Sequence, residues 1–139
     1  MTGPESYALQ PIGVVRSALA RLEDAPMQGY EGAPDAWIEI EPTFAQALEG
    51  VSTGDSVVLL TWFHKADRAV LKVHPRSDPA RPLTGVFVTR SPDRPNPVGL
   101  HRVTVLAIDG TRLHVGPLEA IDGTPVIDIK PVLAETTDS

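Results

Sequence analysis

The amino-acid sequence predicts a small all-β domain, either a barrel or a sandwich. The first reason is a series of about seven short apolar or alternating segments, separated by turn residues at intervals of roughly 8–15 residues. The second is the content of 14 prolines and 11 glycines among 139 residues, which favours many turns over long helices. The third is that no strand is followed by a glycine-rich loop and a helix, which argues against a Rossmann-type nucleotide site.

The first half of the chain contains the most hydrophobic predicted strand. Residues 37–41 alternate apolar and acidic side chains, as a half-buried strand does, and residues 56–64 form a long apolar run typical of a central strand. Thr43 is a suitable N-cap for a short helix that Gly50 would close. The elements expected here are strands at 7–16, 37–41, 56–64 and, more weakly, 69–73, a loop at 23–36 and a helix at 44–49.

The second half is predicted as strands joined by turns and proline-rich loops. Asp109-Gly110 is a strong hairpin signal, because both residues tolerate the positive φ of a type I′ turn. The elements expected here are strands at 84–89, 102–108, 113–115 and 126–130, loops at 74–82 and 118–124, and a frayed tail at 134–139.

The most distinctive segment is TRSPDRPNPVGL, residues 89–100. Each proline restricts its own φ and excludes the preceding residue from the α region, so this segment is not helical and has few conformations. Arg90, Arg94 and Asn96 are therefore displayed on stiff backbone, which suits a site whose groups are placed before a ligand arrives. The alternative is a rigid strand connection with solvated arginines.

The charges are distributed unevenly along the chain. The net charge is −6, yet residues 65–102 contain eight basic and three acidic side chains, a local charge of +5 that leaves −11 elsewhere. An acidic protein is a poor non-specific binder of nucleic acid, but a localised basic face can hold phosphates. An ordinary solvated surface is the alternative.

Several classes of site are disfavoured by composition and motif. The chain has no cysteine, which excludes disulfides, thiolate catalysis and sulfur-ligated metals and makes the cytoplasm the default location. The four histidines lack metal-ligand spacing, and we expect no metal. No apolar run approaches the roughly 20 residues of a membrane span, and we expect no signal peptide. The remaining class of reaction is one in which the protein holds two substrates together and no catalytic acid or base is identified.

Four motifs resemble the TsaA-like (TrmO-type) family in order and spacing. They are QPIGVVRS at 10–17, WFH at 62–64, GVFVTRSPDRPNPVGL at 85–100 and DGTPVIDIKP at 122–131. The resemblance implies a β-barrel domain over residues 8–133 between short tails at 1–7 and 134–139, and a homodimer. It also implies an S-adenosylmethionine-dependent enzyme that N6-methylates threonylcarbamoyladenosine beside the anticodon of tRNA.

The same resemblance implies which residues bind the cofactor. Arg90 would pair with its carboxylate through a charge-assisted hydrogen bond. Leu100 and Ile121 would pack on the adenine, backbone groups of 118–120 would read its edge, and Glu119 or backbone carbonyls would face the sulfonium. The complete set is Met27, Gln28, His64, Lys65, Arg90, Leu100, Leu118, Glu119, Ala120 and Ile121. Structural roles are the alternative: His64 as the end of a buried strand, and Leu100 as a core residue.

The methyl acceptor is less well specified by the sequence. The family's tRNA enzymes usually carry Gln where this chain has Lys65, their loop at 74–81 differs, and longer members have a C-terminal extension. If tRNA is the acceptor, Arg76 and Arg81 would contact phosphates, and Arg94 and Asn96 complete the expected substrate-binding set. A methyltransferase of a small anionic metabolite and a non-catalytic module that binds S-adenosylmethionine remain as alternatives.

Overall fold

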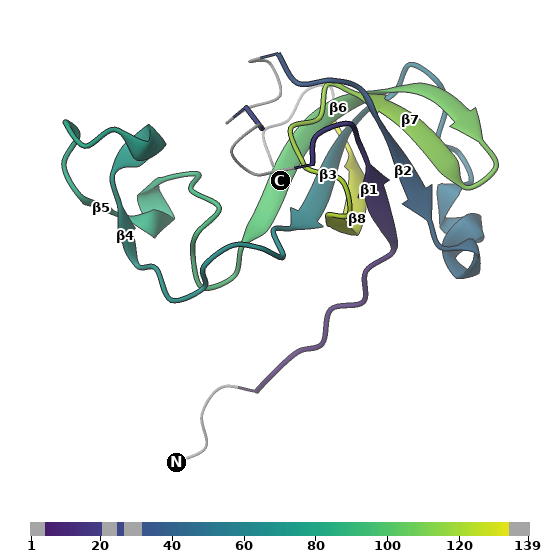
Figure 1. Ribbon diagram of the computed structural model, residues 1–139. Coiled ribbons are helices and arrows are strands. Elements are labelled where there is room, and N and C mark those ends of the chain that lie inside the picture. Colours follow the sequence, from purple (N-terminus) through teal and green to yellow (C-terminus); the bar gives the residue numbers. More distant parts are fainter. Residues whose placement is uncertain (1–4, 21–24, 27–31, 134–139) are drawn as a thin grey trace.

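The computed structural model describes residues 5–20, 25–26 and 32–133. Within them, six antiparallel strands close into a barrel in the order β1-β2-β7-β6-β3-β8, and β8 pairs with β1 (Figure 1). The all-β prediction is confirmed, with a barrel as the architecture. The barrel strands are β1 (Gly13–Arg16), β2 (Ala36–Ile40), β3 (Ser56–Trp62), β6 (Val98–Asp109), β7 (Arg112–Gly116) and β8 (Pro125–Pro131).

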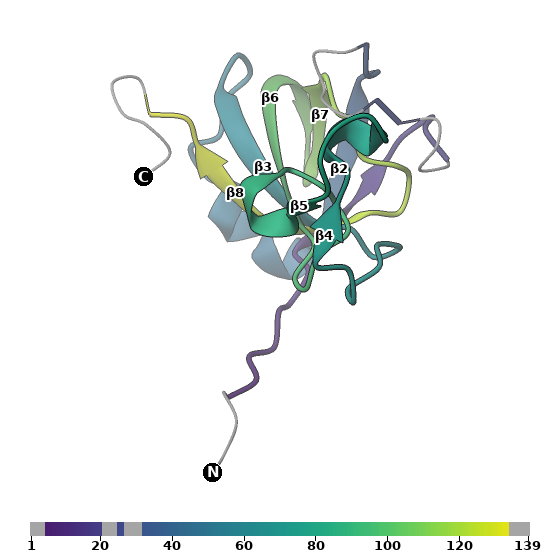
Figure 2. The ribbon, with the colours of Figure 1, turned by 90° about the vertical axis from the view of Figure 1, so that its left-hand side faces the viewer.

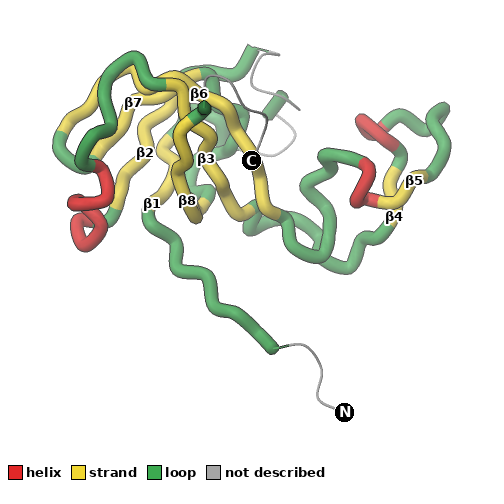
Figure 3. Tube along the Cα trace, turned by 180° about the vertical axis from the view of Figure 1, so that it is seen from behind, coloured by secondary structure: helices red, strands yellow, loops and turns green. Residues whose placement is uncertain are grey.

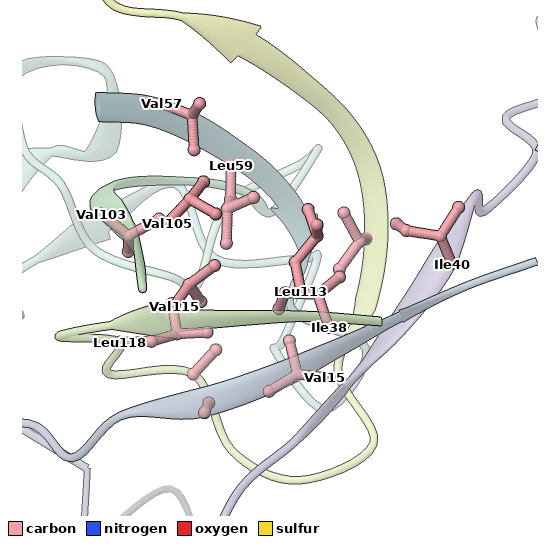
Figure 4. Close-up of a cluster of buried hydrophobic side chains, with 13 residues drawn as sticks. Val15, Ile38, Ile40, Val57, Leu59, Val103, Val105, Leu113, Val115 and Leu118 are labelled. Carbon is pink, nitrogen blue, oxygen red and sulfur yellow. The ribbon is translucent and has the colours of Figure 1, made fainter. Parts of the chain in front are cut away.

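The interior of the barrel is filled by aliphatic side chains from its strands. Successive residues of a strand point to opposite faces, so every second residue of β3 and of the first half of β6 is buried. Val15, Leu59 and Leu113 have no exposed surface, and Figure 4 shows these side chains turned toward a common centre. Burying such a side chain contributes roughly 1.5–3 kcal/mol to stability, which makes this cluster the main stabilising feature of the barrel.

Residues 63–97 leave the barrel between β3 and β6 and form a projection that we call the arm (Figure 1). The arm is an insertion in a hairpin, because β3 and β6 pair directly from Ser56↔Thr104 to Trp62↔Val98. Figure 2, viewed from the side of the arm, places β4 and β5 in front of the barrel. The arm contains β4 (Lys72–Val73), β5 (Thr84–Gly85) and 3₁₀ helices at Pro75–Ser77 and Val86–Val88.

The predicted short helix is present, but its start differs from the prediction. It is a 3₁₀ helix at Pro42–Leu48, and Thr43 does not cap it, because the N-cap position is Glu41 and no side chain makes a capping hydrogen bond. Proline at the first helical position already has a helical φ and lacks the amide hydrogen that a cap would satisfy. This helix lies at the side of the barrel away from the arm (Figure 3), where Phe44 and Leu48 pack against the core.

Two predicted strands are shorter than expected in the structure. The strand expected at residues 7–16 is reduced to β1, and residues 7–12 lie outside it. Pro11 has no amide hydrogen with which to continue the ladder, and Tyr7 is 84% exposed, so little is gained by pairing this segment. The strand expected at 69–73 is reduced to β4.

The strand expected at residues 84–89 is wrong over most of its length. Only β5 is extended, and Val86–Val88 turn into a 3₁₀ helix. The Arg94 guanidinium donates hydrogen bonds to the carbonyl oxygens of Val86 and Thr89, the latter at 2.8 Å. These carbonyls are thereby drawn to one cation rather than to a neighbouring strand, which explains why an apolar, β-branched run forms a turn.

Two further predictions are corrected at the ends of β6. This strand begins at Val98 rather than residue 102, because residues 98–100 pair with the end of β3. The turn into β7 is centred on Gly110 and Thr111, flanked by the pair Asp109↔Arg112. Of these two central residues only Gly110 has a positive φ, of 61°, so the turn is not the expected type I′, and glycine at its first position matches type II′.

Candidate functional site

One end of the barrel gathers most of the segments that the sequence singled out. The strand registers place the ends of β1, β3 and β7 together with the starts of β2, β6 and β8. The arm and residues 117–124, the β7–β8 loop, both leave from this end. The connection between β1 and β2 also joins there; Met27 and Gln28 belong to it and lie outside the described residues.

The β7–β8 loop is anchored at both of its ends by backbone hydrogen bonds. The amide of Leu118 donates to the carbonyl of Pro34 at 3.0 Å, and the amides of Asp122 and Gly123 donate to Leu19 and Val15 at 2.6 and 2.8 Å. Gly123 has a φ of 86°, a conformation that favours glycine. The loop is therefore held firmly against β1 and the chain that precedes β2.

Between these anchors, the amides of residues 119–121 have no hydrogen-bond partner among the described residues, whereas the carbonyl of Ile121 accepts hydrogen bonds from the amide and hydroxyl of Thr124. Ala120 and Ile121 are nevertheless buried, at 2% and 3% exposure. Buried backbone groups are normally paired, so these three amides are suited to reading the edge of a bound ligand. Leu118 is also fully buried, and a ligand here would meet backbone and the Glu119 side chain rather than the other side chains.

Glu119 is connected to the barrel interior by two short hydrogen bonds. Its Oε1 lies 2.5 Å from Nδ1 of His101, and His101 Nε2 lies 2.6 Å from Oγ1 of Thr61. His101 comes from β6 and Thr61 from β3, and both are buried. Phe63 packs edge-on against the imidazole with 5.7 Å between ring centroids. The result is a hydrogen-bonded polar chain that runs from β3 through β6 to the β7–β8 loop.

Gly99 makes room for this polar chain. A β-carbon at position 99 would lie 2.5 Å from Thr61 Oγ1, 2.6 Å from Phe63 Cζ and 2.7 Å from His101 Nε2. All three distances are shorter than real contacts of a β-carbon, so any side chain at this position displaces the hydrogen-bonded groups. Gly99 is therefore needed for the Thr61–His101 contact.

The remaining predicted cofactor residues are exposed. His64 and Lys65 follow the end of β3, and Arg90 lies in the arm; no ion pair connects any of the three to another described residue. Leu100 points outward from β6 and is 47% exposed, so its alternative role as a core residue is wrong. His64 also lies beyond β3 rather than at its buried end.

Arg94 and Asn96, predicted to bind substrate, have partners within the arm. Arg94 binds the two backbone carbonyls that turn the chain after β5, and it is partly buried. Asn96 Oδ1 accepts a hydrogen bond from Arg68 at 3.1 Å, and Arg68 also donates to the carbonyl of Pro95 at 2.7 Å. These contacts hold the proline-rich segment in one shape, and the role of both residues toward a substrate stays a prediction.

The basic loop expected to meet the acceptor forms the tip of the arm. Arg76 and Ser77 adopt positive φ values of 54° and 59°, which are unusual for residues with side chains. The loop is closed by a hydrogen bond of 2.8 Å between His74 Nδ1 and the carbonyl oxygen of Arg81. Nε of Arg81 lies 3.8 Å from Oδ2 of Asp78, which makes an ion pair. The side chains of Arg76 and Arg81 are exposed.

Thr61, Gly99 and His101 were not identified as site residues from the sequence. A signal was present in β6, where Gly99, His101, Val103 and Val105 occupy alternate positions facing the interior. Because the strand was expected to begin only at residue 102, the alternation was not extended to His101.

Comparison with known proteins identifies the family of this chain. The family model described as the tRNA-methyltransferase O N-terminal domain matches residues 14–139. The chain belongs to this family. Two crystal structures of TrmO from Pseudomonas aeruginosa superpose on it with TM-scores of 0.77 and 0.73 at 31% and 30% identity, covering 99% and 97% of this chain. The chain spans 61% of the length of each of these solved chains.

Curated archaeal relatives are similar over most of the chain. A probable S-adenosyl-L-methionine-binding protein of Methanothermobacter thermautotrophicus is 46% identical over 123 residues, which cover 88% of both proteins. The probable S-adenosyl-L-methionine-binding protein PH1056 of Pyrococcus horikoshii is 42% identical over 130 residues, covering 91% of this chain and 82% of that protein.

Two further findings concern the described residues alone. No group of three or more histidine and acidic side chains among them is arranged to hold a metal ion. None of their helices has the length and apolar character needed to cross a membrane.

Gly99→Ala is expected to destabilise the barrel end. The added methyl group overlaps Thr61, Phe63 and His101, and forcing a methyl group into a packed interior costs roughly 1–3 kcal/mol. Chemical denaturation measures the change in free energy of unfolding. Gly85→Ala is the matched control, because its β-carbon would meet nothing within 4 Å; equal stability losses for the two variants would contradict the assignment.

Proposed function

We propose that this chain binds S-adenosylmethionine at the β7–β8 loop and transfers the methyl group to N6 of threonylcarbamoyladenosine beside the anticodon of tRNA. The observation that carries the proposal is the set of amides at residues 119–121, which have no hydrogen-bond partner among the described residues, next to the carboxylate of Glu119 at the barrel end from which the arm leaves. The family description and the names of the curated relatives support it.

The residues present fit such a cofactor. The amides of residues 119–121 and the carbonyls of Glu119 and Ala120 provide donors and acceptors for the edge of an adenine, and the Glu119 side chain provides an anionic acceptor of hydrogen bonds. Arg90 is an exposed guanidinium suited to a carboxylate, and Leu100 offers an exposed apolar surface on the neighbouring strand. When bound, S-adenosylmethionine supplies an electrophilic methyl group on a sulfonium; the residues of this chain bind and orient it.

The arm is suited to bind the anionic acceptor. It begins beside the proposed cofactor site, and it contains most of the +5 segment, including the exposed Arg76 and Arg81 at its tip. A basic surface of this kind holds phosphates without reading sequence, which positions a nucleic acid rather than selecting it. A small anionic metabolite is the alternative acceptor, and a module that binds the cofactor without transferring its methyl group is the alternative to an enzyme.

We also propose that the arm contributes to a homodimer. Its surface carries four large exposed aliphatic or aromatic side chains, and a shallow hollow of about 190 Å³ lies among residues 85–88 and Leu71. Apolar patches on projecting segments are typical of protein–protein contacts. A second copy of the chain would cover this surface and place two basic segments on one particle. The four side chains are Leu71, Leu83, Phe87 and Val88.

The first prediction of the proposal concerns cofactor binding. S-adenosylmethionine or S-adenosylhomocysteine should raise the melting temperature of the purified chain, because a ligand that binds only the native state stabilises it by mass action. Arg90→Ala should weaken binding by about 1.5–3 kcal/mol while the fold persists. Thermal unfolding measures the shift in melting temperature and titration calorimetry measures the affinity, with Arg81→Ala as an exposed-arginine control expected to bind as the wild type does. No binding at millimolar ligand would overturn the proposal.

The second prediction concerns the acceptor. Methyl groups from labelled S-adenosylmethionine should be incorporated into bulk tRNA in preference to a metabolite extract. Arg76→Ala with Arg81→Ala should weaken tRNA binding for every sequence and reduce the dependence of log affinity on log salt by about one unit for each lost phosphate contact. Cofactor affinity should be unchanged. Incorporation into the extract alone would identify the small-molecule enzyme, and incorporation into neither would identify the binding module.

The third prediction concerns the dimer. Phe87→Glu should convert the protein to a monomer, because a carboxylate buried in an apolar contact without a partner is strongly unfavourable. Sedimentation velocity measures the oligomeric state. Leu106→Glu, at an exposed position on the barrel away from the arm, is the control and should leave a dimer. A wild-type protein that sediments as a monomer would rule out the proposed interface.

A further inference from the structure

The polar chain at the barrel end is a costly arrangement for a small domain. Thr61 and His101 are buried at inward positions of β3 and β6, where the other inward residues are aliphatic or glycine. Buried polar groups cost free energy unless they are hydrogen-bonded, and apolar residues of similar volume often stabilise a protein more. Structural need alone therefore does not explain why histidine and threonine occupy these positions.

The chemistry of Thr61, His101 and Glu119 determines which group donates and which accepts in each hydrogen bond of the polar chain. An ionised carboxylate only accepts hydrogen bonds. Nδ1 of His101 therefore carries the hydrogen and donates the hydrogen bond to Glu119. In neutral imidazole the other nitrogen, Nε2, then accepts from the hydroxyl of Thr61. With both ring nitrogens engaged and Phe63 against the ring, the imidazole has one orientation, and it fixes the position of Glu119 Oε1.

Only one oxygen of the Glu119 carboxylate is used in this way. Oε1 is bound by His101, and no hydrogen bond or ion pair joins Oε2 to another described residue. The side chain of Glu119 is 12% exposed, compared with 1% for His101, so the polar chain runs from the interior to the surface. It ends beside the amides of residues 119–121, which have no hydrogen-bond partner within the part of the chain that the structure describes.

We infer that Thr61 and His101 are positioning residues for Glu119, and that Oε2 of Glu119 accepts a hydrogen bond from the sugar hydroxyls of the bound nucleoside cofactor. A carboxylate is a common partner of ribose hydroxyls, and a fixed carboxylate binds at a lower entropic cost than a mobile one. This inference rests on the proposed cofactor site and adds two residues to it that do not touch the ligand.

The test separates positioning from stability through binding of S-adenosylhomocysteine, measured by calorimetry. Thr61→Val keeps the shape of the side chain and removes the hydroxyl, and it should weaken binding roughly 3–10-fold, as expected for one lost hydrogen bond. Thr61→Ser restores the hydroxyl and should bind within about twofold of the wild type. Glu119→Gln replaces the carboxylate by a neutral amide, so the negative charge is lost and one of the two acceptor oxygens becomes a donor. It should weaken binding roughly 10–100-fold.

Val103→Ala is the matched control, because Val103 is buried two residues beyond His101 on the same strand. It should lower the melting temperature and leave the affinity unchanged. A nitrogen NMR spectrum of histidine-labelled protein supplies an independent readout. Nδ1 of His101 should show a bound proton, and its resonance should move when S-adenosylhomocysteine is added to the wild type but much less in Glu119→Gln.

The outcomes distinguish this inference from the proposed function. If the wild type binds S-adenosylhomocysteine and both Glu119→Gln and Thr61→Val bind it equally well, the positioning role is overturned and the cofactor site is kept. An affinity loss in Thr61→Val that Thr61→Ser does not restore would also overturn it. A wild-type protein that binds no S-adenosylhomocysteine would overturn the proposed function and this inference together.

Discussion

Closure of the barrel by β8 is the constraint on which the rest of the structure depends. This strand pairs with β3 on one side and with β1 on the other, so the last strand of the chain joins the first. Closure removes the free sheet edges that would otherwise pair with other chains. It also brings the loop before β8 against β1, where the amides of Asp122 and Gly123 are bound. The geometry of the candidate site is therefore a consequence of barrel closure.

The second determinant is the direct pairing of β3 with β6. Because β3 pairs with β6 along its whole length, the residues between the two strands lie outside the barrel and form the arm. The arm then needs its own internal contacts, since it has only the small β4–β5 sheet. Arg94 and Arg68 supply them by binding backbone carbonyls and Asn96. The stiff proline-rich segment and these arginines together hold a basic surface close to the barrel end.

Sequence reasoning predicted the strands best where burial alternates and worst where one side chain reorganises the backbone. β2, β3, β7 and β8 lie within about two residues of their predicted bounds, and burial alternates clearly along β2, β3 and β7, whereas only Val126 is buried in β8. The run at residues 84–89 has the composition of a strand, and no local pattern reveals that Arg94 binds the carbonyls of Val86 and Thr89. The role of residues 118–121 in cofactor binding was inferred from the family resemblance and stays a proposal, whereas Thr61 and His101 were missed because they are separated by 40 residues along the chain.

The sequence by itself determined the fold class, the family and the stiffness of the segment at 89–100. These follow from the period of apolar residues, from motif order and from the restriction that proline places on its own backbone and on the residue before it. Only the tertiary structure decided that the barrel closes through β8 and that Glu119 joins His101 and Thr61. Contacts between residues distant in sequence depend on strand register, and a shift of one residue in β6 would turn His101 to the outside and leave Glu119 without its partner.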